Sequence, residues 1–251
     1  MIRNDGRLEN ELRPLQIEIN YTMYADGSVL ISGGNTKIIC TASVENKVPA
    51  WLLDKNKNPR HGWLTAEYRM LPSSTDVRKN RELITVDGRT QEIQRLIGRS
   101  LRSIIDLDSL GNNTIRIDCD VIQADGGTRT MAITGSYIAL ILALRKIYST
   151  GKLKIFPVTK FLAAVSVGIL NQNCILDLKY DEDKIAEVDM NIVMLDSGEF
   201  VEIQGTAEAQ AYSRLQLNSM LDLASNGISS IISLQKEILG KELPRQTTFK
   251  N

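Results

Sequence analysis

The sequence has few of the residues on which common catalytic and metal sites are built. Its 251 residues include one histidine, His61, and three widely spaced cysteines, Cys40, Cys119 and Cys174. A single histidine excludes a histidine-rich metal site, and the cysteines match neither a zinc-ligand pattern nor a disulfide framework. The G-x-S-x-G signature of serine hydrolases is absent. The cysteine pattern is typical of a reducing compartment, so we expect a cytoplasmic location.

Long apolar runs and nucleotide-binding loops are absent as well. The longest apolar-rich stretch, 137–144, is too short to span a membrane and is followed at once by Arg145 and Lys146. The first residues contain no apolar segment of the signal-peptide type. Neither G-x-G-x-x-G after a strand nor the P-loop spacing occurs. We therefore expect no membrane partner and no nucleotide site of either standard type.

Net charge is zero over the whole chain, but the segment 78–102 is basic. It contains seven basic side chains against three acidic ones, a net charge of +4. The basic residues are Arg78, Lys79, Arg81, Arg89, Arg95, Arg99 and Arg102. This concentration predicts a local anion-binding face, and a solvated helix surface is the alternative interpretation.

Strand-like stretches occur in two blocks, separated by helical patterns. The first block is expected at 16–21, 28–32, 36–44 and 114–123, and the second at 161–170, 174–180, 188–195 and 200–205. The sequence Asp196-Ser197-Gly198 predicts a hairpin turn between the last two strands. Blocks of strands and helices predict an α+β fold rather than a doubly wound parallel sheet.

Four segments have helical patterns. Apolar residues recur at the spacing of an amphipathic helix over 93–105, and the other helices are expected at 130–147, 213–224 and 228–239. The helix at 130–147 is apolar on most sides and is expected to be buried. Asn226-Gly227 predicts a break between the last two helices. No linker divides the chain, so we expect one domain over 1–243 and an unstructured tail over 244–251.

Two segments combine small residues, an arginine and the start of a helix. They are Asp87–Thr90, before the basic helix, and Gly126–Thr130, before the buried helix. A helix N-terminus presents free N–H groups, and an arginine adds a bidentate donor for an anion. Both segments are therefore candidate phosphate sites. The alternative is that the glycines make turns and the arginines make structural ion pairs.

Carboxylates concentrate between and at the ends of two expected strands. They are Asp177, Asp181, Glu182, Asp183, Glu187 and Asp189. Carboxylates that a strand pair brings together hold hard cations such as Mg²⁺, which takes few protein oxygens and keeps several waters. A solvated acidic loop is the alternative interpretation of this cluster.

Several long strings in the chain carry a family resemblance from about Arg3 to Gln235. They are RNDGR at 3–7 with Arg13-Pro14, ICTASVE at 39–45, GWLTAEY at 62–68, GRTQEIQRLIGR at 88–99, IDCDVIQADGGTRT at 117–130, DMN at 189–191 and QGTAE at 204–208. Together they resemble the ribonuclease PH family of phosphate-dependent exoribonucleases, which trim tRNA 3′ ends.

The resemblance implies a nucleotidyltransferase reaction in which inorganic phosphate removes 3′-terminal nucleotides of tRNA precursors as nucleoside 5′-diphosphates. By motif, it implies phosphate binding at Arg89, Gly127, Thr128 and Arg129. It also implies that Asp183 and Asp189 bind Mg²⁺ or assist the leaving oxygen. Phosphoryl transfer depends mainly on positioning and charge neutralisation, so the residue types agree with this reaction.

The resemblance further implies an S5-domain-2-like fold with mixed sheets and packed helices, and a homo-hexamer built as a trimer of dimers. The implied substrates are tRNA precursors and other RNA 3′ ends, not DNA. The residues expected at RNA or subunit contacts are Arg78, Arg81, Arg95 and Arg99.

Three positions depart from the family pattern. Ser73 stands where the family usually has an arginine, the stretch between Glu82 and Gly88 is two residues short, and a basic insert occupies 55–61. The first two remove positive charge from the implied RNA route.

The main alternative function is a non-catalytic RNA-binding subunit of an exosome-like ring, but such subunits lose the phosphate arginines or the metal aspartates. A small-molecule kinase of the same fold would need an ATP loop that this sequence lacks.

Overall fold

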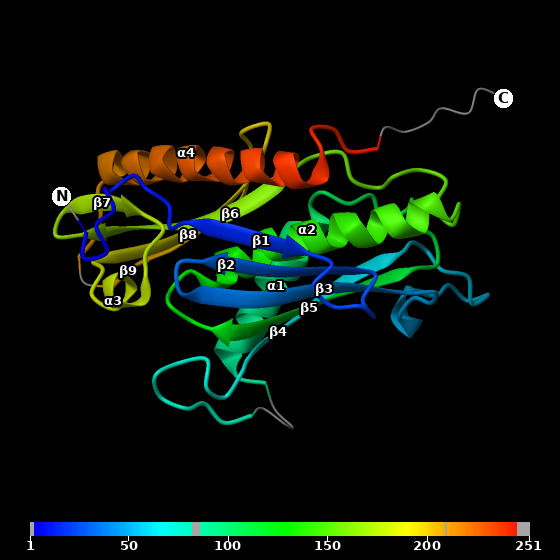
Figure 1. Ribbon diagram of the computed structural model, residues 1–251. Helices are drawn as coiled ribbons and strands as arrows, with labels where there is room; N and C mark the ends of the chain where they lie inside the picture. Colours follow the sequence, from blue (N-terminus) through cyan, green and yellow to red (C-terminus); the bar gives the residue numbers. More distant parts are fainter. Residues whose placement is uncertain (1–2, 82–85, 209, 245–251) are drawn as a thin grey trace.

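The computed structural model describes residues 3–81, 86–208 and 210–244, and its elements form two sheets with helices packed between and over them (Figure 1). The first sheet has the order β1-β2-β3-β5-β4. Its strands are β1 (Leu15–Ile19), β2 (Gly27–Gly33), β3 (Thr36–Glu45), β4 (Trp63–Met70) and β5 (Thr114–Gln123). All neighbours in it are antiparallel except β4 and β5, which run parallel. This is the mixed sheet that the sequence predicts.

The second sheet is antiparallel throughout and has the order β7-β6-β8-β9. Its strands are β6 (Leu162–Leu170), β7 (Asn173–Leu176), β8 (Val188–Leu195) and β9 (Phe200–Ala207). The predicted hairpin turn joins β8 to β9, with Gly198 at a positive φ of 92°. The strand predicted at 174–180 is wrong beyond Leu176, because Asp177 turns into the left-handed region at φ 53°.

Four α-helices and one 3-10 turn complete the described fold. They are η1 (Ala50–Leu52), α1 (Gly88–Arg102), α2 (Thr128–Ser149), the short α3 (Tyr180–Asp183) and α4 (Arg214–Leu239). The two helices predicted at 213–224 and 228–239 are one continuous helix, so the predicted break at Asn226-Gly227 is wrong. A Cβ at Gly227 would come within 2.9 Å of Leu176 Cδ1, so this glycine permits close packing of α4 on β7.

The helix α2 is the centre of the core. It packs against β2 and β3 of the first sheet and β6 of the second, and its buried side chains belong to one hydrophobic cluster that includes both sheets. By length and composition α2 could cross a membrane, but 83% of its most apolar window is buried inside the protein. Complete burial requires an apolar sequence on all sides of the helix, which agrees with the buried helix expected here.

A charged cluster ties the N-terminal segment to the second sheet. Arg3 donates from Nε to Glu182 Oε1 at 2.7 Å, and Arg13 Nη2 lies 2.6 Å from Asp177 Oδ1. Arg7 Nη1 lies 3.4 Å from Asp177 Oδ2, and all five side chains are buried. Burying an unpaired charge is very costly, so each of these arginines and carboxylates depends on its ion-pair partner to remain charged in the core.

Candidate functional site

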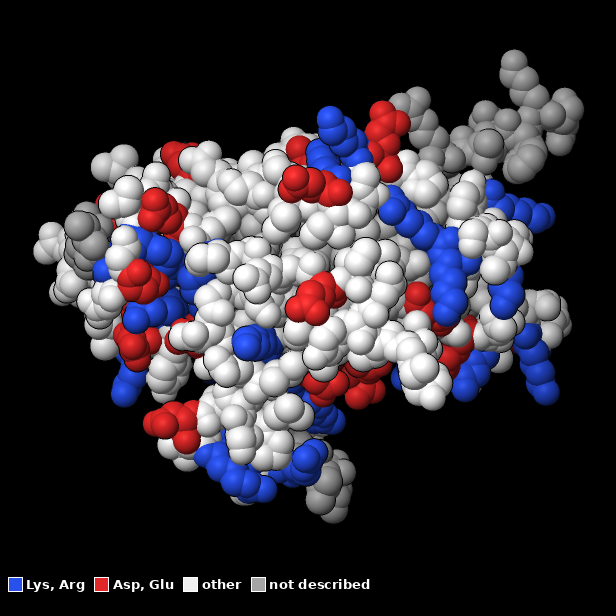
Figure 2. Space-filling view, in the orientation of Figure 1, with Lys and Arg blue, Asp and Glu red and all other residues white. Residues whose placement is uncertain are grey.

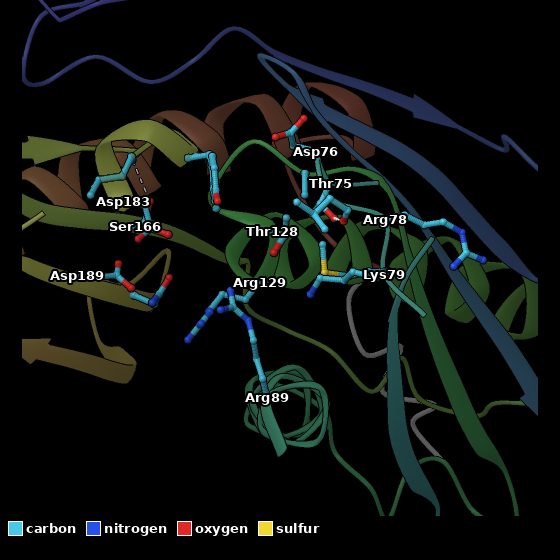
Figure 3. A pocket seen from close by; sticks show the side chains of 18 residues that line it. Thr75, Asp76, Arg78, Lys79, Arg89, Thr128, Arg129, Ser166, Asp183 and Asp189 are labelled. Carbon is cyan, nitrogen blue, oxygen red and sulfur yellow. Dashed lines mark hydrogen bonds between the residues drawn. The ribbon is translucent and has the colours of Figure 1, made fainter. Parts of the chain in front are cut away.

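A cavity of about 500 Å³ lies where the two sheets meet (Figure 3). The first turns of α1 and α2 contribute Arg89 and Arg129. Asp183 from α3 and Asp189 from β8 form the facing wall. The structure therefore brings together both predicted phosphate segments and two of the six predicted carboxylates.

The loop before α2 is shaped for close approach of a ligand to the backbone. Gly126 and Gly127 have φ of 77° and 63°, and a Cβ at Gly126 would lie 2.5 Å from the Leu178 carbonyl oxygen. Gly127 is the N-cap of α2, and no side chain caps that helix end. The first amide groups of α2 thus have no capping side chain, which is the arrangement that binds anions at helix N-termini.

Two neighbours hold this loop in place. Tyr68 donates from its hydroxyl to Thr128 Oγ1 at 2.9 Å, and burial raises the pKa of the Tyr68 phenol, which keeps it protonated. Behind the loop, Arg13 donates from Nη1 to the Asp125 carbonyl oxygen. Burial lowers the pKa of the Arg13 guanidinium, but the hydrogen bond and charge of Asp177 outweigh that effect and raise it overall. The charged cluster therefore supports the loop that precedes α2.

The two arginines approach the cavity from different helices. Asp87 caps α1 by accepting from the Thr90 amide, which places Arg89 in the first turn with its side chain directed into the cavity (Figure 3). Arg129 Nη1 lies 3.9 Å from Glu92 Oε1, a distance that leaves most of its donors available. Two guanidinium groups beside one helix N-terminus form a strongly anion-attracting site.

The facing carboxylates repel one another. Burial raises the pKa of Asp183, against the opposing charges of Arg89 and Arg129. Burial and the charge of Asp183 raise the pKa of Asp189 to about 6, against the opposing charges of Arg129 and Arg89. Buried carboxyl groups with raised pKa values are typical of a site that binds a proton or a cation.

The other predicted carboxylates do not join this pair. Asp177 and Glu182 are partners of the buried arginines, Asp181 is exposed and lies 3.5 Å from Lys179, and Glu187 accepts from the Gln172 amide. Over residues 3–81, 86–208 and 210–244, no group of three or more His, Cys, Asp or Glu side chains is arranged to hold a metal ion. Of the six carboxylates named in the sequence analysis, only Asp183 and Asp189 line the cavity, because Asp177 and Glu182 neutralise buried arginines.

Only one of the remaining predicted arginines lines the cavity. Arg78 lines the cavity, whereas Arg81 and Arg95 are exposed outside it. Arg99 lies on α1 and its Nη2 is 2.6 Å from Glu202 Oε1 on β9. Figure 2 shows basic side chains gathered over the loop between β4 and α1, below a broad uncharged band. The shortened stretch before Gly88 falls on 82–85, outside the described residues.

Several cavity residues, three polar ones among them, were not predicted as site residues. Lys79 comes from the loop between β4 and α1, Ser166 from β6 and Asn191 from β8. Asn191 lies in the DMN string, and its i+2 spacing from Asp189 on a strand was the available signal, because alternate strand residues share a face.

This arrangement defines a phosphate-handling enzyme of the exoribonuclease class, and the comparisons agree. The chain belongs to the 3′ exoribonuclease family, since residues 11–146 match its domain 1 and residues 160–227 match its domain 2. It is similar to ribonuclease PH of Bacillus subtilis, with 53% identity covering 97% of this chain and 99% of the relative. Ribonuclease PH of Moorella thermoacetica is 55% identical over 96% of this chain and 95% of the relative. The resemblance to the ribonuclease PH family is confirmed.

Solved structures share the fold at lower identity. The crystal structure of rice (Oryza sativa) Rrp46 has a TM-score of 0.74 at 21% identity, covering 94% of this chain and all of the other. The Archaeoglobus fulgidus exosome with RNA bound to the active site has a TM-score of 0.75 at 18% identity, covering 92% of each chain. These similarities confirm the predicted α+β fold class. The prediction of one domain over 1–243 stays a prediction.

Proposed function

We propose that this chain is a phosphorolytic 3′→5′ exoribonuclease that shortens tRNA precursors and other RNA 3′ ends. The observation that carries the proposal is one cavity with Arg89, Arg129 and an uncapped helix N-terminus on one side and two carboxylates on the other. Relatives of this length and identity bear the name ribonuclease PH. A non-catalytic ring subunit is not favoured, because the exosome neighbours are distant and this chain has both halves of the site.

Arg89, Arg129 and the backbone at Gly127 and Thr128 bind the attacking inorganic phosphate. One of its oxygens forms a bond to the phosphorus of the last phosphodiester. The bond from that phosphorus to the 3′-oxygen of the preceding nucleotide breaks, and that oxygen gains a proton. The products are a nucleoside 5′-diphosphate and an RNA one nucleotide shorter. Fixed positive charge around the phosphates lowers the barrier without reorganisation during the reaction.

Asp183 and Asp189 fit a Mg²⁺ ion, because both carboxyl groups are buried beside other carboxylates: burial and the charge of Glu208 raise the pKa of Asp183, and burial and the charge of Asp183 raise the pKa of Asp189. Mg²⁺ commonly takes one or two protein carboxylates and keeps several waters. When bound, the ion supplies positive charge that neutralises charge on the transferring phosphoryl group. The same carboxyl pair assists departure of the 3′-oxygen, since a group with a pKa near 6 exchanges protons close to neutral pH.

The experiment that tests the function measures products with and without phosphate. Purified protein with Mg²⁺, phosphate and a 3′-extended tRNA is expected to release nucleoside 5′-diphosphates, and omission of phosphate should stop the reaction. Chromatography of the nucleotides distinguishes diphosphates from monophosphates. Phosphate-independent release of monophosphates would indicate hydrolysis and contradict the proposal.

Replacement of either arginine should act through phosphate. Arg129→Ala and Arg89→Ala each remove a charge-assisted contact worth about 1.5–3 kcal/mol, so activity should fall roughly tenfold to a hundredfold. Each change also removes a positive charge that lowers the pKa of Asp189, so the acid limb of the pH–rate profile should move to higher pH. Steady-state kinetics over phosphate concentration and pH measure both effects.

Arg116→Ala is the matched control for these variants, because Arg116 pairs with Glu45 at 2.7 Å on the first sheet and does not line the cavity. Its phosphate KM and rate should equal those of the unchanged protein. RNA binding without phosphate should change little in all three variants. An unchanged phosphate KM and rate in Arg129→Ala or Arg89→Ala would assign that arginine a structural role.

The proposed assembly is a homo-hexamer, a trimer of dimers, in the cytoplasm. Large exposed side chains such as Met23 and Tyr24, which are 82% and 91% exposed, support contacts between copies, and three free cysteines support a reducing location. A closed ring would present the basic segments containing Arg78, Arg81, Arg95 and Arg99 several times to one RNA.

Sedimentation should therefore give a hexamer, and affinity for tRNA should fall steeply with salt as counterions are released. The two measurements use the same preparation, so assembly and RNA affinity can be compared directly. A dimer with full activity on tRNA would contradict the need for a ring.

A further inference from the structure

Two neutral polar side chains lie side by side on the cavity wall next to the carboxylate pair. Asn191 on β8 and Ser166 on β6 are register partners, and Asp189 pairs with Gly168 two residues along the same ladder. Partners in an antiparallel ladder place their side chains on the same face, so Ser166 and Asn191 are neighbours. Both line the cavity while being only 3% and 5% exposed. Figure 3 shows Ser166 on the wall that carries Asp183 and Asp189, across from Thr75.

Part of the hydrogen-bonding capacity of this pair is available to a ligand. Among the described residues no hydrogen bond of the Asn191 side-chain amide is found, and its polar atoms are not fully enclosed by protein, so they are open to the cavity. Ser166 Oγ accepts from the Leu178 amide at 3.1 Å, which leaves its own proton available for donation. Buried side-chain polar groups are nearly always satisfied, and an unsatisfied one is costly. Asn191, which is only 5% exposed as a residue and lines the cavity, therefore offers its amide to a ligand group there.

The chemistry of the pair favours a hydroxyl group over a phosphate. Arginines and helix amides already serve the anionic groups on the opposite wall, whereas Asn191 and Ser166 carry no charge and offer both donors and an acceptor. A hydroxyl also donates and accepts, so it can satisfy both side chains at once. Asn191 is two residues from Asp189, which the proposed function assigns to the leaving 3′-oxygen. The ribose hydroxyl next to that oxygen is the 2′-hydroxyl of the penultimate nucleotide.

We propose that Asn191 and Ser166 bind the 2′-hydroxyl of the penultimate ribose and thereby select RNA over DNA 3′ ends. This inference rests on the proposed exoribonuclease function. The 2′-hydroxyl is the group by which a protein distinguishes RNA from DNA at a given nucleotide. A site built to bond a hydroxyl rejects the analogue that lacks it, because its own buried polar groups then stay unpaired.

The test uses the full-length protein, Mg²⁺, phosphate and three oligonucleotides of one sequence. One is all RNA, one has a single 2′-deoxy nucleotide at the penultimate position, and one has it at the terminal position. The unchanged protein should release the first nucleoside diphosphate about tenfold to a hundredfold more slowly from the penultimate-deoxy substrate, and the terminal change should have a smaller effect. Equal rates on all three would overturn the inference, and no diphosphate from any of them would instead overturn the proposed function.

Asn191→Ala should lower the rate on all-RNA substrate toward the rate on penultimate-deoxy substrate, so that the ratio of the two approaches one. Ser166→Ala provides a second variant with the same expected direction. Thr75→Val is the matched control, since it removes another neutral hydroxyl of the same cavity and should leave the ratio unchanged. An active Asn191→Ala protein that retains the full ratio, or that loses rate equally on both substrates, contradicts the inference.

Discussion

Asp189→Asn is expected to lower phosphorolysis by about a thousandfold or more, and Asp183→Asn should have a comparable effect. An amide keeps the shape of the carboxyl group but loses the negative charge that holds a divalent ion. Both side chains line the cavity opposite Arg89 and Arg129, so neither loss is compensated nearby. Removal of Mg²⁺ by a chelator should cause a loss of similar size in the unchanged protein.

The same substitution should stabilise the metal-free fold. The pKa of Asp189 is raised to about 6, so between about pH 4 and 6 the folded state binds more protons than the unfolded state. Ionised Asp189 therefore costs stability above pH 6, and Asp189→Asn removes that cost. The free energy of unfolding at pH 7.5 should rise by about 1–3 kcal/mol, and the gain should disappear below about pH 4.

Urea unfolding at several pH values measures the stability change, and diphosphate release measures activity. Asp181→Asn is the matched control, because Asp181 belongs to the same short helix as Asp183 but is exposed and paired with Lys179. It should leave both the rate and the Mg²⁺ titration unchanged. Full activity of Asp189→Asn with an unchanged Mg²⁺ titration would remove Asp189 from the reaction.

Asp177→Asn should lower the free energy of unfolding by about 3–5 kcal/mol. Asp177 accepts from the Arg13 amide, from Arg13 Nε and Nη2 and from Arg7 Nη1. Removing its charge leaves two buried guanidinium groups without full compensation, which costs much more than the pair itself contributes. Asparagine tolerates the positive φ at this position, so the effect reports charge and not backbone strain.

Denaturant unfolding monitored by circular dichroism measures this effect. Asp5→Asn is its control, since Asp5 pairs with the same Arg7 at 2.8 Å but is 28% exposed, and its loss should cost less than about 1 kcal/mol. Activity of folded Asp177→Asn should also fall, because Arg13 supports the loop that precedes α2. Equal stability of the two variants would show that the charged cluster is not essential to the fold.

Most elements follow from local patterns, and the exceptions have identifiable causes. The apolar stripe over 93–105 predicts α1, although the helix begins five residues earlier at Gly88 because Asp87 caps it. The strand-like stretch at 188–195 predicts β8 as it is observed. Asn226-Gly227 predicts a helix end, but Gly227 instead permits α4 to contact Leu176 of β7. A contact between segments so far apart in the chain cannot be predicted from the residues next to Gly227. The strand β4 was overlooked, and its pairing partner β5 is more than forty residues away in the chain.

The anion-binding segments of the candidate site were predictable from the sequence, but which carboxylates line the cavity was not. Glycine beside arginine at a helix start indicates an anion site, and Arg89 and Arg129 do lie at such starts. A run of carboxylates, in contrast, does not say which members face a cavity. Asp177 and Glu182 turn away to pair with arginines that lie more than 160 residues earlier. Their neighbours Asp183 and Asp189 remain in the cavity.

The sequence by itself determined the fold class, the family resemblance and the two phosphate segments, because these depend on residue type and on spacing within a short stretch. The tertiary structure alone decided that the two arginines face Asp183 and Asp189 across one cavity, and that Asn191 and Ser166 are neighbours beside them. The physical reason is burial. Whether a charge is neutralised by a distant partner or left facing a cavity depends on which segments the packed core brings together.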